Sequence, residues 1–254
     1  MTPSTSLKRS DRGAGHGLRR LVAPANLMTS LVLIFPLFLF YQLGVLLSPE
    51  VVNGADLITA RLLRLLHQSA ELYLLINVVL LLAFVLVVAL LRRHQQFSLK
   101  MFVPVVLESA LYAVTMGTLI VQVMGWIGID PSLSIRAAAA EALPKSTVTR
   151  VALALGAGVH EELVFRLILL TGAVGLLHHV IRLRRWLAIV LAFLVTSIVF
   201  SAAHHVLGGE PWRLGVFVYR FFCGLVFATL FQLRGLAVAV YTHALYDVYV
   251  MVMV

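Results

Sequence analysis

The chain has 254 residues, of which 61% are hydrophobic and only 12% are charged, and its formal net charge is +9. Soluble domains carry about 25% charged residues, so the charged side chains are too few to cover a soluble surface. The apolar residues occur in runs of about 20, which can cross a ~30 Å hydrocarbon layer. The lone cysteine, Cys223, can form no intrachain disulfide. These observations exclude a soluble enzyme, a secreted disulfide scaffold and a disordered chain. The composition predicts an all-α, polytopic transmembrane helical bundle.

The chain opens with a polar, basic segment, Met1–Ala23 (residues 1–23), which we expect to be a disordered cytoplasmic tail. The first apolar run behind it is too long for the hydrophobic region of a signal peptide. No small-residue cleavage site follows that run, so we expect a retained span.

Seven apolar segments follow, and each is predicted to form a membrane helix. They are Asn26–Leu47, Ala70–Leu91, Met101–Met124, Thr149–Val180, Trp186–His204, Leu214–Leu233 and Leu236–Val254. Two linkers are predicted to be interfacial helices. Asp56–Gln68 is amphipathic, with its arginines on one face and its leucines on the other. Asp130–Leu143 begins with Asp-Pro, a common helix start, and ends before a proline.

The distribution of Lys and Arg predicts that the N-terminus lies inside, because cytoplasmic loops are enriched in these residues. With that orientation, about twelve of the 20 cations fall in inner loops and about six in outer links. The positive charge is then explained by topology and by anionic lipid headgroups, so nucleic acid is not a predicted partner. We expect an integral protein of a prokaryotic plasma (inner) membrane.

Several ionisable residues lie inside the apolar segments, where an Asp, Lys or Arg costs about 2.5–3.5 kcal/mol at the centre of a span. Such residues mark function by default. They are Glu108, Glu161, Glu162, Arg166, His204, Arg220, His243 and Asp247. Glu108 and Arg220 can simply pair with each other across two spans, which would make them structural.

The other six follow a pattern of four-residue spacings on three helices. Glu162 and Arg166 stand one turn apart and can neutralise each other. Glu161 points about 100° away from that pair. The intervals Phe200 to His204 and His243 to Asp247 are also four residues. Three helices therefore each offer one polar stripe, and such stripes converge in the core of a bundle.

The three motifs, EExxxR, FxxxH and HxxxD, occur in this order within apolar helices, and here the sequence resembles the CPBP family. This family contains the type II CAAX prenyl endopeptidases and the bacteriocin-processing and self-immunity proteins. The resemblance covers about Thr149–Val254 and includes the stretch Gly224–Asp247, which looks like the last helical hairpin of the family. It implies a bundle in which residues 24–148 supply N-terminal membrane helices and residues 149–254 supply the catalytic ones.

Peptide hydrolysis needs an activated water, a group that stabilises the oxyanion and a proton for the leaving amine. A desolvated carboxylate such as Glu161 is a competent general base near neutral pH. The resemblance implies the same role for Glu161, with His204 holding the water and with His243 and Asp247 facing the scissile carbonyl. Many members have Asn in place of Asp247. An ionised Asp cannot donate a hydrogen bond, so Asp247 must either be protonated or orient His243 by accepting from it.

The remaining motif residues, Glu162, Arg166 and Phe200, are expected to support the helices beside Glu161. The predicted activity is that of an intramembrane endopeptidase with no cofactor and no metal. It would act on a membrane-associated protein, lipidated or not, in the lipid bilayer. The cleavage sequence, the need for a prenyl group and the oligomeric state are not readable from the sequence.

Other proteases fit less well. A zincin needs HExxH, but Val164 stands where the second His is required. A serine protease would use a Ser in a Gly-flanked loop, whereas Ser201 lies inside the FxxxH motif. The GxGD motif is absent, because Ile129 precedes Asp130 and Tyr246 precedes Asp247.

Two alternatives stay open at this point. One is a metal-dependent membrane protease or metal carrier, because Glu161, His204, His243 and Asp247 are all plausible Zn²⁺ ligands. The other is a non-catalytic membrane scaffold or immunity protein of the same family.

Counting along the segments places Glu161 and His204 in the outer half of the membrane but His243 near the inner end of its segment. Either the last hairpin starts deeper in the bilayer, or the topology differs.

Overall fold

The structure is a computed structural model that describes residues 24–47, 69–129, 146–207 and 211–253, and within these ranges the chain is helical with no strand. The predicted tail (1–23) and the predicted interfacial helices at Asp56–Gln68 and Asp130–Leu143 lie outside the described residues. All seven predicted membrane segments are helical. They are α2 (Leu27–Leu47), α5 (Ala70–Leu91), α6 (Phe102–Trp126), the segment α8 (Thr147–Glu162) with its continuation to Val180, α10 (Arg185–Val206), α11 (Leu214–Arg234) and α12 (Leu236–Met253).

Six of these segments are long and apolar enough to cross a membrane, and the seventh, α12, contains a shorter apolar helix, Leu236–Val252. The all-α polytopic bundle is therefore confirmed, and the chain is an integral membrane protein.

The helix α5 has no buried residue in the most apolar stretch of its span. It packs on α2 through the stacked rings of Phe35 and Phe84, whose centroids lie 4.6 Å apart. Most of its other residues are exposed, apart from Tyr73 near its start, which is buried.

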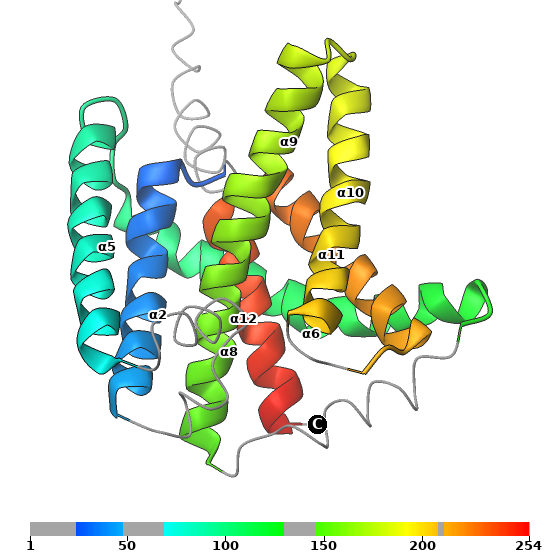
Figure 1. The fold of residues 1–254 in the computed structure, drawn as a ribbon, viewed down its shortest axis with the longest axis horizontal. Coiled ribbons are helices and arrows are strands. Elements are labelled where there is room, and N and C mark those ends of the chain that lie inside the picture. The colour runs from blue at the N-terminus through cyan, green and yellow to red at the C-terminus, as the bar shows by residue number, and fades with distance from the viewer. Residues whose placement is uncertain (1–23, 48–68, 130–145, 208–210, 254) are drawn as a thin grey trace, which may run out of the picture.

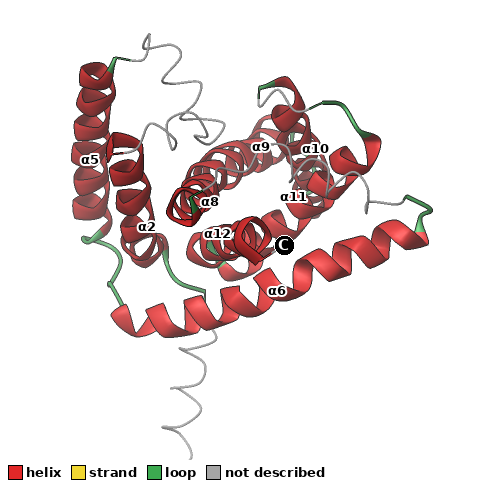
Figure 2. Ribbon diagram, turned by 90° about the horizontal axis from the view of Figure 1, so that it is seen from below, coloured by secondary structure: helices red, strands yellow, loops and turns green. Residues whose placement is uncertain are grey.

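The helices α2, α5, α8 and α10 run along one direction, whereas α6 crosses the others (Figures 1 and 2). The hairpin of α9 (Thr171–Gly175) and α10 projects beyond the rest of the bundle at one end (Figure 1). The helix α12 is central and packs against α8, α6, α11 and α2. Its first five residues, Leu236–Val240, are at most 3% exposed.

The turn between α11 and α12 packs against the segment just before α2. Gly235 has φ +88, a conformation that side chains other than glycine rarely adopt. A Cβ on Gly235 would also lie 3.1 Å from the carbonyl oxygen of Ala25, just before α2. This glycine therefore fixes the last hairpin against the start of α2. The mismatch that counting along the segments predicted is absent, because His243 Nε2 lies 3.8 Å from Glu161 Oε2.

An ion pair at this turn differs from the predicted one. Glu108 of α6 does not pair with Arg220, as the sequence suggested, but with Arg234 at the end of α11. The Arg234 Nε lies 2.5 Å from Glu108 Oε1, and its Nη2 lies 2.8 Å from Oε2. Tyr112 donates to the same carboxylate at 2.8 Å. The reason is that α6 crosses the bundle and brings Glu108 to the α11–α12 turn. Arg234 thus forms an ion pair with an acidic residue of another helix.

Small residues allow α12 to approach α8 closely. A Cβ on Gly158 would lie 2.7 Å from both the Cβ and the backbone nitrogen of Ala244, so only glycine fits without a shift. Small residues at such contacts are typical of membrane helix packing. Because Ala244 follows His243, this contact sets the distance between His243 and the glutamates of α8.

The helix that carries the glutamates changes its winding directly after them. The segment α8 ends at Glu162 and continues as the π-helix η2 (Leu163–Leu170), followed by α9 and a second π-helix, η3 (Leu176–Val180). π-helical turns are rare and are frequently found at functional sites. Here the π-helix η2 contains Arg166. It lies in the middle of the 34-residue helical segment Thr147–Val180, between α8 and the part that projects from the bundle (Figure 1).

Candidate active site

The three predicted polar stripes meet around the carboxylate of Glu161. Its Oε1 lies 3.6 Å from His204 Nε2, and its Oε2 lies 3.8 Å from His243 Nε2. The three residues come from α8, α10 and α12, so they converge only in the folded bundle. Glu161 and His243 are each 4% exposed. Both distances exceed that of a direct hydrogen bond, and a separation of this size between polar groups is one that a single water can bridge.

Glu162 connects α8 to α12 and to the π-helix at the same time. Its Oε1 accepts a hydrogen bond from His243 Nδ1 at 2.8 Å. Its Oε2 lies 3.3 Å from Arg166 Nε. The side chain of Glu162 is completely buried. The expected Glu162–Arg166 pair is therefore present, and Glu162 has a second contact, to His243, that the sequence did not predict.

Arg166 is held by an aromatic face as well as by a carboxylate. The guanidinium carbon lies 4.4 Å from the ring centroid of Phe200, within the range of a cation–π contact. The Arg166 Nη2 donates to the carbonyl oxygen of Gly224 at 3.3 Å. Phe200 is 2% exposed, and its ring also contacts that of His204, with the centroids 5.0 Å apart.

The imidazole of His204 is oriented by its own helix. Its Nδ1 lies 2.9 Å from the carbonyl oxygen of Phe200, which can only accept, so Nδ1 carries the proton. In the neutral imidazole, Nε2 then bears a lone pair that faces Glu161. A ring nitrogen whose tautomer is set in this way can accept a hydrogen bond from a water between the two groups.

Asp247 lies one turn beyond His243 on α12. Its Oδ2 is 3.5 Å from His243 Nε2. The side chain of Asp247 is 21% exposed, more than those of Glu161 (5%) and His204 (11%). A carboxylate at that position cannot donate to an oxyanion while it is ionised, but it provides negative charge beside the His243 ring.

Two further residues lie near the site although the sequence interpretation did not place them there. The ring of Phe227, on α11, stacks on His243 with the centroids 4.3 Å apart and an interplanar angle of 13°. Arg220, also on α11, interacts electrostatically with His204. A Phe in an apolar span looks like any lipid-facing residue in the sequence, so Phe227 carried no signal. Arg220 was noted as an intramembrane charge, but its spacing matched no motif.

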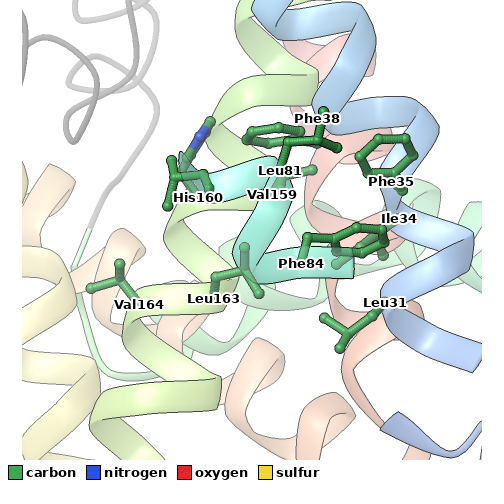
Figure 3. A pocket seen from close by; sticks show the side chains of 11 residues that line it. Leu31, Ile34, Phe35, Phe38, Leu81, Phe84, Val159, His160, Leu163 and Val164 are labelled. Carbon is green, nitrogen blue, oxygen red and sulfur yellow. The ribbon is translucent and has the colours of Figure 1, made fainter. Parts of the chain in front are cut away.

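The residue before Glu161, His160, points to a different side of α8, toward α2. His160 Nδ1 donates to Gly156 O at 2.9 Å, and its Nε2 lies 3.4 Å from Gln42 Nε2. Gln42 also accepts from the Tyr73 hydroxyl, so this network joins α8 to α2 and α5. His160 is the one polar residue lining a pocket of about 300 Å³ (Figure 3). The other lining residues are Leu31, Ile34, Phe35, Phe38, Leu80, Leu81, Phe84, Val159, Leu163 and Val164.

The plausible zinc ligands of the sequence analysis do not form a recognisable ligand set. Among the residues that the structure describes, no group of three or more His, Cys, Asp and Glu side chains is arranged to hold a metal ion.

Comparison with protein families gives one finding that bears on this site. Residues 144–249 match the family model described as type II CAAX prenyl endopeptidase Rce1-like. The matched segment contains all three motifs, and the resemblance to the CPBP and CAAX proteases is thereby confirmed for this part of the chain. Comparison with curated proteins gave no match, and neither did comparison with solved structures.

Proposed function

We propose that the chain is a glutamate-dependent intramembrane endopeptidase that hydrolyses a peptide bond of a membrane-associated protein. One observation carries the proposal: Glu161 faces the Nε2 atoms of His204 and His243, at 3.6 and 3.8 Å, in the core of a membrane helix bundle. The match of residues 144–249 to a protease family supports the reaction class. A lipidated protein is one such substrate, in line with the description of that family.

In this mechanism, Glu161 is the general base. A water held between Glu161 and the Nε2 of His204 loses a proton to the carboxylate and attacks the scissile carbonyl carbon. The position of Glu161 favours this step, because a water between its Oε1 and His204 Nε2, which are 3.6 Å apart, is within hydrogen-bond reach of the carboxylate. Glu161 then passes the proton to the leaving amine, so its starting state is restored.

The oxyanion is stabilised by His243. Because Nδ1 of His243 donates to Glu162, donation from Nε2 requires the imidazolium form. The carboxylates of Glu162 and Asp247 supply the compensating negative charge on either side of the ring. Asp247 thus acts through His243, and not as a donor in its own right. Phe227 keeps the ring in its plane by stacking on it.

Glu162, Arg166 and Phe200 act as positioning residues. Glu162 fixes the orientation of His243, and Arg166 neutralises Glu162 and holds it in place. We further propose that residues 149–254 provide the chemistry and that residues 24–148 cover it from the lipid. The helix α6 supports this division because it packs along α12 without contributing a motif residue.

The proposal is tested by comparing protein termini in membranes and medium from cells that carry wild type, Glu161→Gln or Glu71→Gln at equal levels. Glu71 is the control, because it is an exposed carboxylate at the start of α5. New termini that are present with wild type and Glu71→Gln but absent with Glu161→Gln are expected. They would also identify the substrate. If the three sets of termini coincide while a phenotype still requires the protein, the scaffold alternative replaces the enzyme.

A further inference from the structure

The turn between η3 and α10 has the character of a membrane boundary. Arg182, Arg184 and Arg185 are not buried, and Trp186 is 62% exposed. No Asp or Glu occurs in α9, η3 or α10. His178 Nδ1 donates to Leu183 O at 2.9 Å and holds the turn together. Arginines next to a Trp at the end of a hairpin are typical of the lipid headgroup region.

A second pair of cations lies at the same end of the molecule. Arg92 and Arg93 directly follow α5 and are exposed. The end of α5 and the tip of the α9–α10 hairpin point the same way (Figure 1). This basic end of the bundle is therefore one membrane boundary. The positive-inside rule makes it the cytoplasmic one.

The candidate active site lies far from the basic end. The helix α10 is uninterrupted from Arg185, at the basic turn, to Val206. His204 is 19 residues after Arg185, which corresponds to about 28 Å along the helix axis. That distance is nearly the full thickness of the hydrocarbon core, about 30 Å. His204 thus lies close to the opposite boundary and not in the middle of the bilayer.

Aromatic and partly exposed residues follow directly beyond His204. Trp212, just before α11, is 64% exposed, and its ring packs near that of His205, with the centroids 5.1 Å apart. A Trp at this end matches Trp186 at the other end of α10, as expected for aromatic belts at two interfaces.

The site residues become less buried toward the end of the bundle that lies opposite the basic end. Exposure of the side chains rises from Glu162 (0%) through His204 (11%) to Asp247 (21%). On α12, every residue from Leu236 to Ala244 is buried, whereas the residues from Leu245 to Val250 are partly exposed or exposed. The C-terminal end of α12 points away from the basic end of the bundle (Figure 1).

We infer that the site opens toward the boundary opposite the basic end, so that substrates present their scissile bond at the extracytoplasmic interface. The substrate class is then a membrane protein with a cleavable segment beside its outer membrane boundary. The substrate part of this inference rests on the proposed protease activity. An interfacial segment suits hydrolysis, because its backbone groups can bond to water, whereas an unwound backbone in the hydrocarbon layer costs several kcal/mol per unsatisfied group.

The orientation is tested first, without any assay of proteolysis. Cys223 is buried, and Cys223→Ser provides a cysteine-free background. In that background, Trp212→Cys is compared with Ile181→Cys, an exposed position in the basic turn. A membrane-impermeant maleimide is expected to label Trp212→Cys in intact cells and Ile181→Cys only after permeabilisation. Labelling of both from one side, or the reverse pattern, would overturn the inference.

The substrate class is tested with the segment that the comparison of termini identifies. That segment is placed in a single-span reporter just outside the membrane, at its centre, or just inside. Cleavage of the first reporter alone is expected, and cleavage of the central or inner reporter would overturn the inference. If Glu161→Gln leaves every terminus unchanged, the protease proposal fails and the substrate class falls with it. The labelling pattern would still decide on which side the site opens.

Discussion

His243 Nδ1 donates a hydrogen bond of 2.8 Å to Glu162 Oε1, which ties α12 to α8 beside the candidate active site. The second oxygen of Glu162 faces Arg166 Nε at 3.3 Å. An imidazole, a carboxylate and a guanidinium thus form one buried chain across three helical segments. Glu162 therefore couples the stability of the bundle to the orientation of His243.

Replacing Glu162 with Ala is expected to destabilise the protein strongly. The change leaves the guanidinium of Arg166 buried without its carboxylate, and breaking a buried pair in this way costs about 3–5 kcal/mol. Thermal unfolding in detergent micelles measures the effect, with Glu71→Ala as a control at an exposed carboxylate. A melting temperature equal to that of wild type would show that this pair does not hold the bundle together.

Asp247→Asn separates two roles for this residue. If Asp247 supplies negative charge beside His243, the Asn variant loses that charge and kcat/KM falls by about tenfold, equivalent to about 1.4 kcal/mol. The fold should be unaffected, because the Asp247 side chain is partly exposed. The measurement is kcat/KM on the identified substrate. An Asn variant as active as wild type, or more so, would instead make residue 247 a hydrogen-bond donor to the oxyanion.

The arrangement of the site could be predicted in part from the sequence because each motif lies within one helix. Residues four apart share a face, so the pairs Glu162–Arg166 and His243–Asp247 follow from helix geometry alone. The structure shows both pairs in proximity, at 3.3 and 3.5 Å. The seven apolar segments could likewise be predicted, since their length and composition decide the structure in a bilayer.

Contacts between helices could not be predicted in the same way. The contact between His243 and Glu162 depends on how deep the α11–α12 turn lies, and Gly235 alone does not reveal that depth. The pairing of Glu108 with Arg234 depends on α6 crossing the bundle. Such distances are set by tertiary packing, and one sequence contains no periodic pattern that encodes them.

The Glu108–Arg234 pair is expected to fasten α6 to the α11–α12 turn. Its geometry is bidentate, and both side chains are about one fifth exposed. Residues in one such network show coupling energies of about 0.5–3 kcal/mol. A double-mutant cycle with Glu108→Gln and Arg234→Gln, read by thermal unfolding, measures this energy. Strict additivity of the two single changes would contradict a stabilising pair.

Proteolysis is expected to be insensitive to metal chelators. The proposed mechanism activates water through Glu161 and His204 and needs no metal ion. Among the residues that the structure describes, no group of three or more His, Cys, Asp and Glu side chains is arranged to hold one. The test is the rate of substrate cleavage before and after treatment with 1,10-phenanthroline. Loss of activity that zinc restores would support the metal-dependent alternative.

Gly158→Ala is expected to impair both the stability and the activity of the protein. The new methyl group would meet Ala244 at 2.7 Å, so α12 must move away from α8. Overpacking of this kind costs about 1–3 kcal/mol. The movement also carries His243 away from Glu162, because His243 precedes Ala244.

The matched control is Gly172→Ala in α9, on the same helical segment, where no atom lies within 4 Å of the added Cβ. There the change should be neutral or stabilise the helix by up to about 1 kcal/mol, because alanine has the higher helix propensity. Thermal unfolding and cleavage rate are measured for both variants. Equal behaviour of the two would mean that the close approach of α8 and α12 does not position His243. Loss of stability and cleavage in Gly158→Ala alone would tie the activity to this helix contact.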